Sequence, residues 1–213
     1  MEDARQARFA RRFELAATVL LATAAVATAW AAYQSARWRG EQAKAGGRSI
    51  AARVESTRAE NVANRQGQID VALFTQWVDA YARDETELEG FYRKRFRPEF
   101  QPAFQAWVAT KPRKNPNAPL TPFAMPQYKL AAAAKADRLE TKAAAFSQQV
   151  ERLLQRADNY ALAGVLFAAS LFFAGISTRL RSPTARMVVL GFGSALFLGS
   201  VIWIATFPVS LSV

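Results

Sequence analysis

The sequence predicts an all-α protein: three transmembrane helices and a helical extracytoplasmic domain, which extends as a helical hairpin from spans 1 and 2. Two observations predict this fold. Residues 15–36, 159–178 and 187–213 contain no charged side chain, although the 213-residue chain has 28 Lys and Arg and 17 Asp and Glu. Each run can cross the membrane core, which takes about 20 apolar helical residues. The polar segment between the first two runs has the apolar spacing of helices.

The first element is a basic N-terminus, residues 1–14, that leads into span 1 at 15–36. A cleaved signal peptide would have a hydrophobic region of only about 7–15 residues. This region is longer, and aromatic residues typical of a membrane interface lie near its end, at Trp30, Tyr33 and Trp38. We therefore expect an uncleaved signal anchor, preceded by four arginines: Arg5, Arg8, Arg11 and Arg12.

The short loop 179–186 joins span 2, at 159–178, to span 3, at 187–207. The loop carries three arginines and no acid, and the N-terminus is also basic. Short basic segments stay in the cytoplasm, so both should lie there. Residues 37–158 and the tail 208–213 would then lie outside the cytoplasm, where a chain without cysteine suits an oxidising compartment.

The extracytoplasmic domain is predicted to begin as a continuation of span 1. Residues 34–68 are rich in Ala, Arg, Glu and Gln, which favour a helix. Glycine weakens a helix, so we expect a bend or break at Gly40 and at the Gly46–Gly47 pair.

Three shorter segments follow. Apolar residues at helical spacing predict an amphipathic helix over 69–97 and a short one over 102–110. Five prolines then fall within 111–128, which excludes a continuous helix and predicts an extended loop with polyproline character. Apolar residues within this Pro-rich loop suggest that it packs along the domain.

The end of the domain has the clearest pattern. Apolar residues recur every seven positions in two series, which together we call the seam: Leu139, Phe146, Leu153 and Tyr160, with Ala136, Ala143, Val150 and Ala157. No helix breaker intervenes before span 2, so one helix is expected from about 130 to 178. The seam favours two arrangements equally, packing within its own domain or an intermolecular coiled coil.

Small residues four positions apart mark candidate helix-packing faces in the membrane, because they let helix backbones approach closely. Span 2 has Gly164 and Ala168, and span 3 has Gly191, Ala195 and Gly199. The span 3 stripe either packs within a three-helix bundle or joins two copies of the protein.

The residue types present exclude most enzyme classes. The chain has no histidine and no cysteine, and therefore lacks the commonest general base, the commonest transition-metal ligand and any thiol nucleophile. The acidic cluster at 79–89 is best explained as a solvated helix face. We therefore expect no catalytic residue, no metal and no cofactor. Because the spans carry no ionisable side chain, an ion-coupled transporter is also disfavoured.

One stretch, FYRKRFRPEF at 91–100, interleaves aromatic residues with four cations: Arg93, Lys94, Arg95 and Arg97. In the cytoplasm this pattern would suggest nucleic acid, but outside the membrane no nucleic acid is expected. Anionic lipid headgroups, a cell-wall polymer or a protein partner would suit these side chains better. The alternative is structural, with the aromatic residues buried and the cations at the rim.

Four segments, FTQWVDAYARDE, FYRKRFRPEF, PLTPFAMPQY and VIWIATFPVS, resemble a family of bacterial inner-membrane proteins with one span, an external helical domain and two closing spans. The resemblance implies this architecture and a bacterial source, and it implies no known activity. We expect a non-enzymatic, structural or interaction component of the cell envelope, acting as a homo-oligomer or as a subunit of a membrane complex. An oligomeric channel is the alternative.

Overall fold

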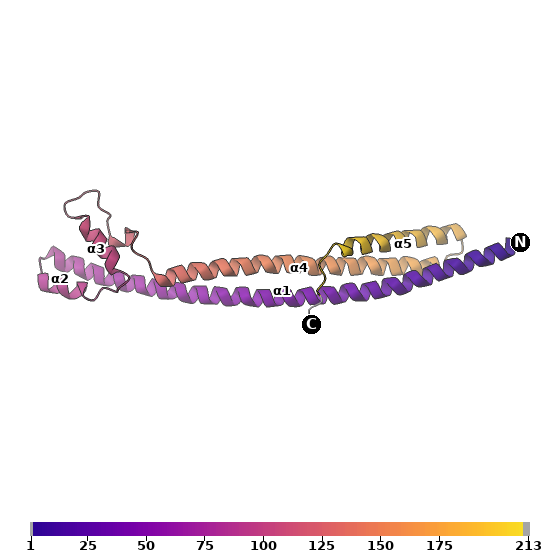
Figure 1. The fold of residues 1–213 in the computed structure, drawn as a ribbon, viewed down its shortest axis with the longest axis horizontal. Coiled ribbons are helices and arrows are strands. Elements are labelled where there is room, and N and C mark those ends of the chain that lie inside the picture. Colours follow the sequence, from indigo (N-terminus) through magenta and orange to yellow (C-terminus); the bar gives the residue numbers. More distant parts are fainter. Residues whose placement is uncertain (1, 211–213) are drawn as a thin grey trace. The chain divides into compact units, whose positions relative to one another are not determined.

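The computed structural model describes residues 2–210, with the side chains of residues 2–7, 9 and 10 left aside; Met1 and the end of the predicted tail, 211–213, lie outside it. Within residues 2–210 the fold is all-α, without a strand (Figure 1). Its elements are α1 (Glu2–Ala82), α2 (Thr86–Arg93), α3 (Gln101–Ala109), the 3₁₀ helix η1 (Pro122–Ala124), α4 (Ala131–Ser177) and α5 (Pro183–Ala205).

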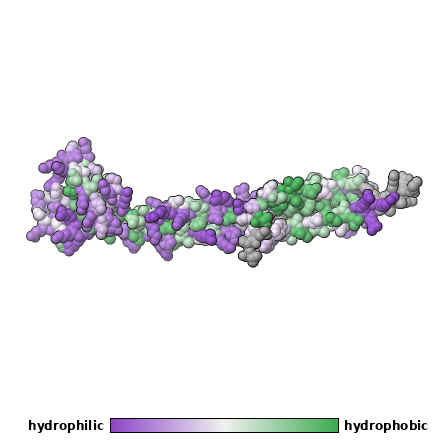
Figure 2. All heavy atoms as spheres, viewed as in Figure 1, coloured by the Kyte–Doolittle hydropathy of each residue, from purple (hydrophilic) through white to green (hydrophobic). Residues whose placement is uncertain are grey.

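Three of these helices, α1, α4 and α5, are long and apolar enough to cross a membrane, as the charge-free runs predict. Figure 2 shows hydrophobic residues gathered over α5 and over the neighbouring lengths of α1 and α4, and hydrophilic residues over α2 and α3. The chain is thus consistent with a multi-pass membrane protein.

The chain divides into two compact units. The membrane unit comprises the residues up to Gly47 and those from Ser147 onward; the polar unit comprises Arg48–Phe146. Both α1 and α4 contribute residues to each unit.

In the membrane unit, small side chains bring the helices together. Ala31 on α1 is buried, and a Cβ added to Gly164 on α4 would lie 3.7 Å from its methyl group. α5 lies close to α4 at Gly193, where an added Cβ would lie only 3.1 Å from the Phe173 Cβ. A larger residue at 193 would require the two helices to shift by a few tenths of an ångström.

The chain after α5 is fixed by side chains from the other two helices. The buried Gln34 amide donates to the Ser210 carbonyl (3.3 Å), and its oxygen accepts from the Ser210 N–H (3.1 Å). Tyr160 on α4 also donates to the Pro208 carbonyl at 3.1 Å. These bonds satisfy backbone groups that a segment without secondary structure would otherwise leave unpaired.

The seam packs against α1 of the same chain. In the membrane unit, Leu153, Ala157 and Tyr160 form a cluster with Trp38 and Ala45 of α1. In the polar unit, two serines of α1 donate to carbonyl oxygens of α4: Ser49 to Ala143 at 3.0 Å, and Ser56 to Ala136 at 2.8 Å. The prediction of one helix from 130 to 178 is confirmed by α4.

Two helix predictions need correction. The expected break at the glycines is absent, because α1 continues through Gly40, Gly46 and Gly47. Each glycine costs a helix only about 1 kcal/mol, and the buried Ala45 and Ala52 pack on either side of the pair.

The predicted helix over 69–97 is in fact two helices. α1 ends at Ala82, and Asp84 takes a left-handed conformation with φ of 59°. The Glu85 N–H then donates to the Ala80 carbonyl at 3.0 Å, which closes the helix end as a left-handed cap does. Periodicity could not reveal this break, because α2 keeps apolar residues at helical spacing. The Pro-rich loop, predicted to be extended, contains one 3₁₀ turn at η1.

Candidate functional site

The centre of the polar unit is a cluster of six buried aromatic residues contributed by α1, α3 and the chain before α3: Phe74, Trp77, Phe96, Phe100, Phe104 and Trp107. Their rings meet mostly edge to face; Trp77 and Phe104 lie 4.8 Å apart, and Phe74 and Trp107 lie 5.4 Å apart. Such pairs are favourable because the ring edges are positive and the ring faces negative. The cluster holds α3 against the end of α1.

Beside this cluster, α1 places a carboxylate with no exposed surface, Asp70. Its Oδ2 accepts from the Arg97 guanidinium and from the Tyr128 hydroxyl, each at 3.1 Å. Arg97 also pairs with Glu99 at 2.9 Å. We call these residues the Asp70 network; it ties α1 to the chain before α3 and to the end of the Pro-rich loop.

Burial sets the electrostatics of the Asp70 network. Loss of solvent raises the pKa of Asp70, although Arg97 and the Tyr128 hydrogen bond act in the opposite direction. Burial, together with the nearby carboxylate, raises the pKa of Tyr128 to about 12. Arg97 is thus shared by two acids, the buried Asp70 and the more exposed Glu99.

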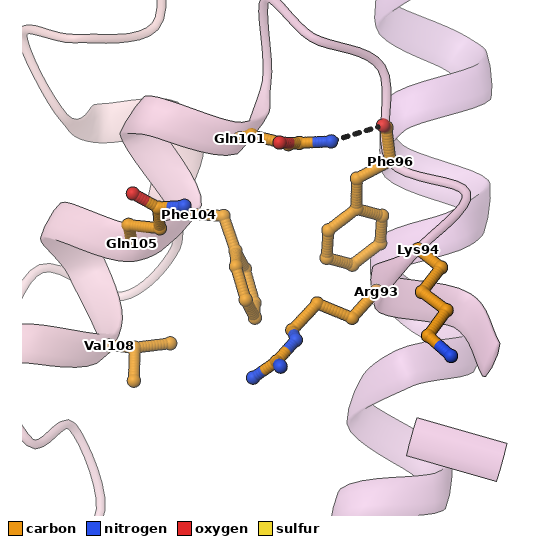
Figure 3. A pocket seen from close by; sticks show the side chains of 7 residues that line it. All are labelled: Arg93, Lys94, Phe96, Gln101, Phe104, Gln105 and Val108. Carbon is orange, nitrogen blue, oxygen red and sulfur yellow. Dashed lines mark hydrogen bonds between the residues drawn. The ribbon is translucent and has the colours of Figure 1, made fainter. Parts of the chain in front are cut away.

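Two cavities open next to the aromatic cluster. The first, the α2–α3 cavity, has a volume of about 500 Å³ and is lined by Arg93, Lys94, Phe96, Gln101, Phe104, Gln105 and Val108. Figure 3 shows the Arg93 side chain reaching from α2 toward Phe104 and Val108 of α3, whereas the adjacent Lys94 side chain points away from them. Gln101 donates to the Phe96 carbonyl at 3.1 Å, which holds the start of α3 to the preceding turn.

The second cavity, the loop cavity, has a volume of about 480 Å³ and lies where the Pro-rich loop begins. Its walls are aromatic and its rim is basic, with lining residues Trp77, Tyr81, Glu89, Arg93, Phe104, Trp107, Val108, Lys111, Pro112, Arg113 and Lys114. The Arg113 guanidinium lies 4.6 Å from the centre of the Tyr81 ring. Arg93, Phe104 and Val108 line both cavities, so the two are neighbours.

The four cations predicted to meet an anionic surface do not act as one group. Arg93 and Lys94 line cavities, whereas Arg95 stacks on its neighbour Phe91 at 3.3 Å. Arg97 is mostly buried and paired with two acids. Phe96 and Phe100 of the same stretch are in the aromatic core, as the structural alternative expects.

The candidate helix-packing residues also separate. Leu153 is buried, Leu139 and Phe146 are half-buried, and Gly164 faces Ala31. In contrast, Ala168 and the span 3 stripe of Gly191, Ala195 and Gly199 are exposed. The stripe therefore does not pack within the three-helix arrangement, where Gly193 takes that role, and its part in self-association stays a prediction.

Sequence reasoning missed the Asp70 network and the loop cavity. Asp70 interrupts a series of buried positions on α1, Ala63, Phe74 and Trp77, and an acid on an apolar face is the signal that could have found it. Three cations of the loop cavity, Lys111, Arg113 and Lys114, lie in the Pro-rich loop, for which the sequence predicts only an extended connection. Among residues 2–210, no group of three Asp or Glu could hold a metal ion.

No family model, no curated protein and no solved structure matches this chain. A function is therefore inferred from the residues and their arrangement.

Proposed function

We propose that this protein is a non-enzymatic, multi-pass protein of the bacterial inner membrane that acts as a structural or interaction component of the cell envelope. Its N-terminus and the loop 179–186 lie in the cytoplasm. Residues 37–158 and the C-terminus lie outside. The observation that carries the proposal is that α1 and α4 each combine a membrane-spanning length with part of the polar unit. A helical domain with its own aromatic core is thus attached to the bilayer by two helices.

The residue types support a binding role over a catalytic one. The chain has no histidine or cysteine. Of the acidic cluster, Asp79 pairs with Arg83 at 2.9 Å, and Asp84, Glu85 and Glu87 are exposed. A general acid or base usually lies in a desolvated cleft beside a charged partner, and an exposed carboxylate on a helix face does not fit that description.

Self-association in the membrane is the second part of the proposal. The small residues of the α5 stripe are exposed beside a shallow groove of about 300 Å³, lined by Leu166, Ala195, Leu196, Gly199, Ser200 and Trp203. Helix association in lipid depends on close packing at small residues, because apolar side chains gain nothing by leaving lipid. A second copy of the protein, or a helix of another membrane protein, would fit this face.

Disulfide crosslinking tests the proposal directly, since the chain contains no cysteine. Ala195→Cys in native membranes should form a covalent dimer on oxidation with copper phenanthroline. Val201→Cys is the matched control, because it is exposed on the same helix about 120° away around the axis. If neither variant gives a crosslink to itself or to another membrane protein, α5 contacts only lipid and the proposed self-association is wrong. Equal dimer from both variants would indicate random collision.

A further inference from the structure

We propose that the loop cavity is a binding site for a small organic anion: a flat apolar ring that carries a phosphate or carboxylate group. This inference does not depend on the membrane orientation or on self-association. Three observations carry it: an excess of positive charge without salt bridges, aromatic walls, and a strained loop residue that lines the cavity.

The charge of the cavity favours an anion. Four cations line it, Arg93, Lys111, Arg113 and Lys114, against a single acid, Glu89. Within residues 2–210 none of the four forms a salt bridge, although Glu89 lines the same cavity. Cations gathered around a partly enclosed space repel one another, and an anionic group placed between them removes that repulsion.

The walls favour a ring. Trp77, Tyr81, Phe104 and Trp107 present aromatic surface to the cavity, and the Arg113 guanidinium lies over Tyr81. Flat ligands gain from offset or edge contacts with such residues. The volume of about 480 Å³ lies within the range typical of small-molecule sites.

The cations of the loop are held in place by an unusual backbone. Lys111 has a φ of 54°, a left-handed conformation that costs energy in a residue other than glycine. Its carbonyl accepts from the N–H groups of Lys114 (2.8 Å) and Asn115 (3.0 Å), and its own N–H donates to the Val108 carbonyl. Strained residues of this kind concentrate at binding sites, and here the turn brings Lys111 and Lys114 to one rim of the cavity.

Calorimetric titration of the full chain in mild detergent tests this assignment with three probes. Phenyl phosphate has both the ring and the anion, whereas inorganic phosphate and phenol have one each. Phenyl phosphate should bind at least tenfold more tightly than either of the others. Its affinity should fall as salt is added, because salt screens charge. If phenyl phosphate binds no better than inorganic phosphate, or if none of the three binds, the assignment is wrong.

Variants locate the binding. Lys111→Gln and Arg113→Gln should each lower phenyl phosphate affinity by about tenfold, whereas Lys129→Gln, an exposed cation of the polar unit outside both cavities, should leave it unchanged. Unchanged unfolding temperatures show that the variants fold. Equal affinity for all three variants would overturn the site.

A displacement experiment distinguishes a free anion from a lipid headgroup. Dihexanoyl phosphatidylglycerol carries the phosphate without a ring and should fail to displace phenyl phosphate. Displacement at equal concentration would show that the cavity takes a lipid headgroup, and the proposed requirement for a ring would be wrong.

Discussion

At the scale of single residues, Asp70 is an ionisable side chain that is fully buried in the polar unit. Arg97 and Tyr128 both bind its Oδ2, and its Oδ1 has no partner among the described residues. Desolvation outweighs the attraction of Arg97, so the pKa of Asp70 is raised above its ordinary value of 3.8. The folded polar unit therefore holds this proton more tightly than the unfolded chain does.

This raised pKa predicts a pH dependence of stability. The contribution of Asp70 is fully present below its unfolded pKa of 3.8 and is lost as the pH rises through the higher folded pKa. Asp70→Asn imitates the protonated acid, so the wild type should lose stability relative to this variant across that window. Chemical unfolding followed by tryptophan fluorescence from about pH 3 to about pH 7 measures the difference. Asp79→Asn, which removes an exposed acid of the same helix, is the matched control. Parallel curves for Asp70→Asn would contradict the prediction.

Tyr128→Phe should destabilise the polar unit by about 0.5–1.5 kcal/mol, because the hydrogen bond to Asp70 is lost while the ring stays packed on Phe100 and Phe123. The raised pKa of about 12 adds a signature at high pH. Stability from the Tyr128 proton is complete below pH 10.0 and is lost as the pH rises through about 12, so the variant should lack this loss. Denaturant titrations measure both effects. Tyr33→Phe, which removes an exposed hydroxyl of α1, is the matched control.

At the scale of elements, α1 and α4 pack through small side chains at a spacing of seven residues. The α1 series runs Ala17, Ala24, Ala31, Trp38, Ala45, Ala52 and Ala59; every member is buried, and all but Trp38 are small. The α4 partners Ala136, Ala143 and Ala157 are buried as well. Small residues at such positions bring backbones close enough for Ser49 and Ser56 to reach α4 carbonyls.

Two adjacent leucines test the seam. Leu153 is 6% exposed and Leu154 is 43% exposed, so the same truncation has different consequences at neighbouring positions. Leu153→Ala should cost about 2–5 kcal/mol, because it leaves a cavity beside Trp38 and Ala157. Leu154→Ala should cost much less. Limited proteolysis in mild detergent compares them, and equal protease sensitivity would mean that the seam does not stabilise the packing of α4 on α1.

Enlarging an alanine tests the close approach from the other direction. Ala143→Leu places a large side chain at a position that is 1% exposed, beside the Ser49 hydrogen bond, and should cost about 1–3 kcal/mol through overpacking. Ala144→Leu changes an exposed neighbour and should be close to neutral. Thermal unfolding of the two variants gives the comparison. A stable Ala143→Leu variant would show that the helices can separate without loss.

At the scale of the whole molecule, the proposed topology is based on the distribution of charge. Asn61 and Ser182 are both exposed, and the proposed topology puts them on opposite sides of the inner membrane. Ser35, near the end of span 1, is buried and would report poorly. In outer-membrane-permeabilised cells, a membrane-impermeant thiol reagent should label Asn61→Cys and leave Ser182→Cys unlabelled until the inner membrane is opened. Labelling of Ser182→Cys alone would invert the topology.

The sequence by itself determined the helical class, the three spans and the bounds of α4, because each depends on local properties. Burying charge in hydrocarbon is costly, so charge-free runs mark the spans wherever the rest of the chain lies. A seven-residue repeat similarly predicts which face of a helix is buried, but it does not predict which segment packs against that face.

Only the tertiary structure decided what those faces contact. α1 continues through its glycines, where local propensity predicts a bend or break. The helix break at Asp84 depends on one backbone conformation that periodicity does not encode. The Asp70 network joins residues 27 and 58 positions apart, and the loop cavity combines α1, α2, α3 and the Pro-rich loop. Such sites arise from contacts between segments that are distant in the sequence, and the pattern within one segment does not predict those contacts.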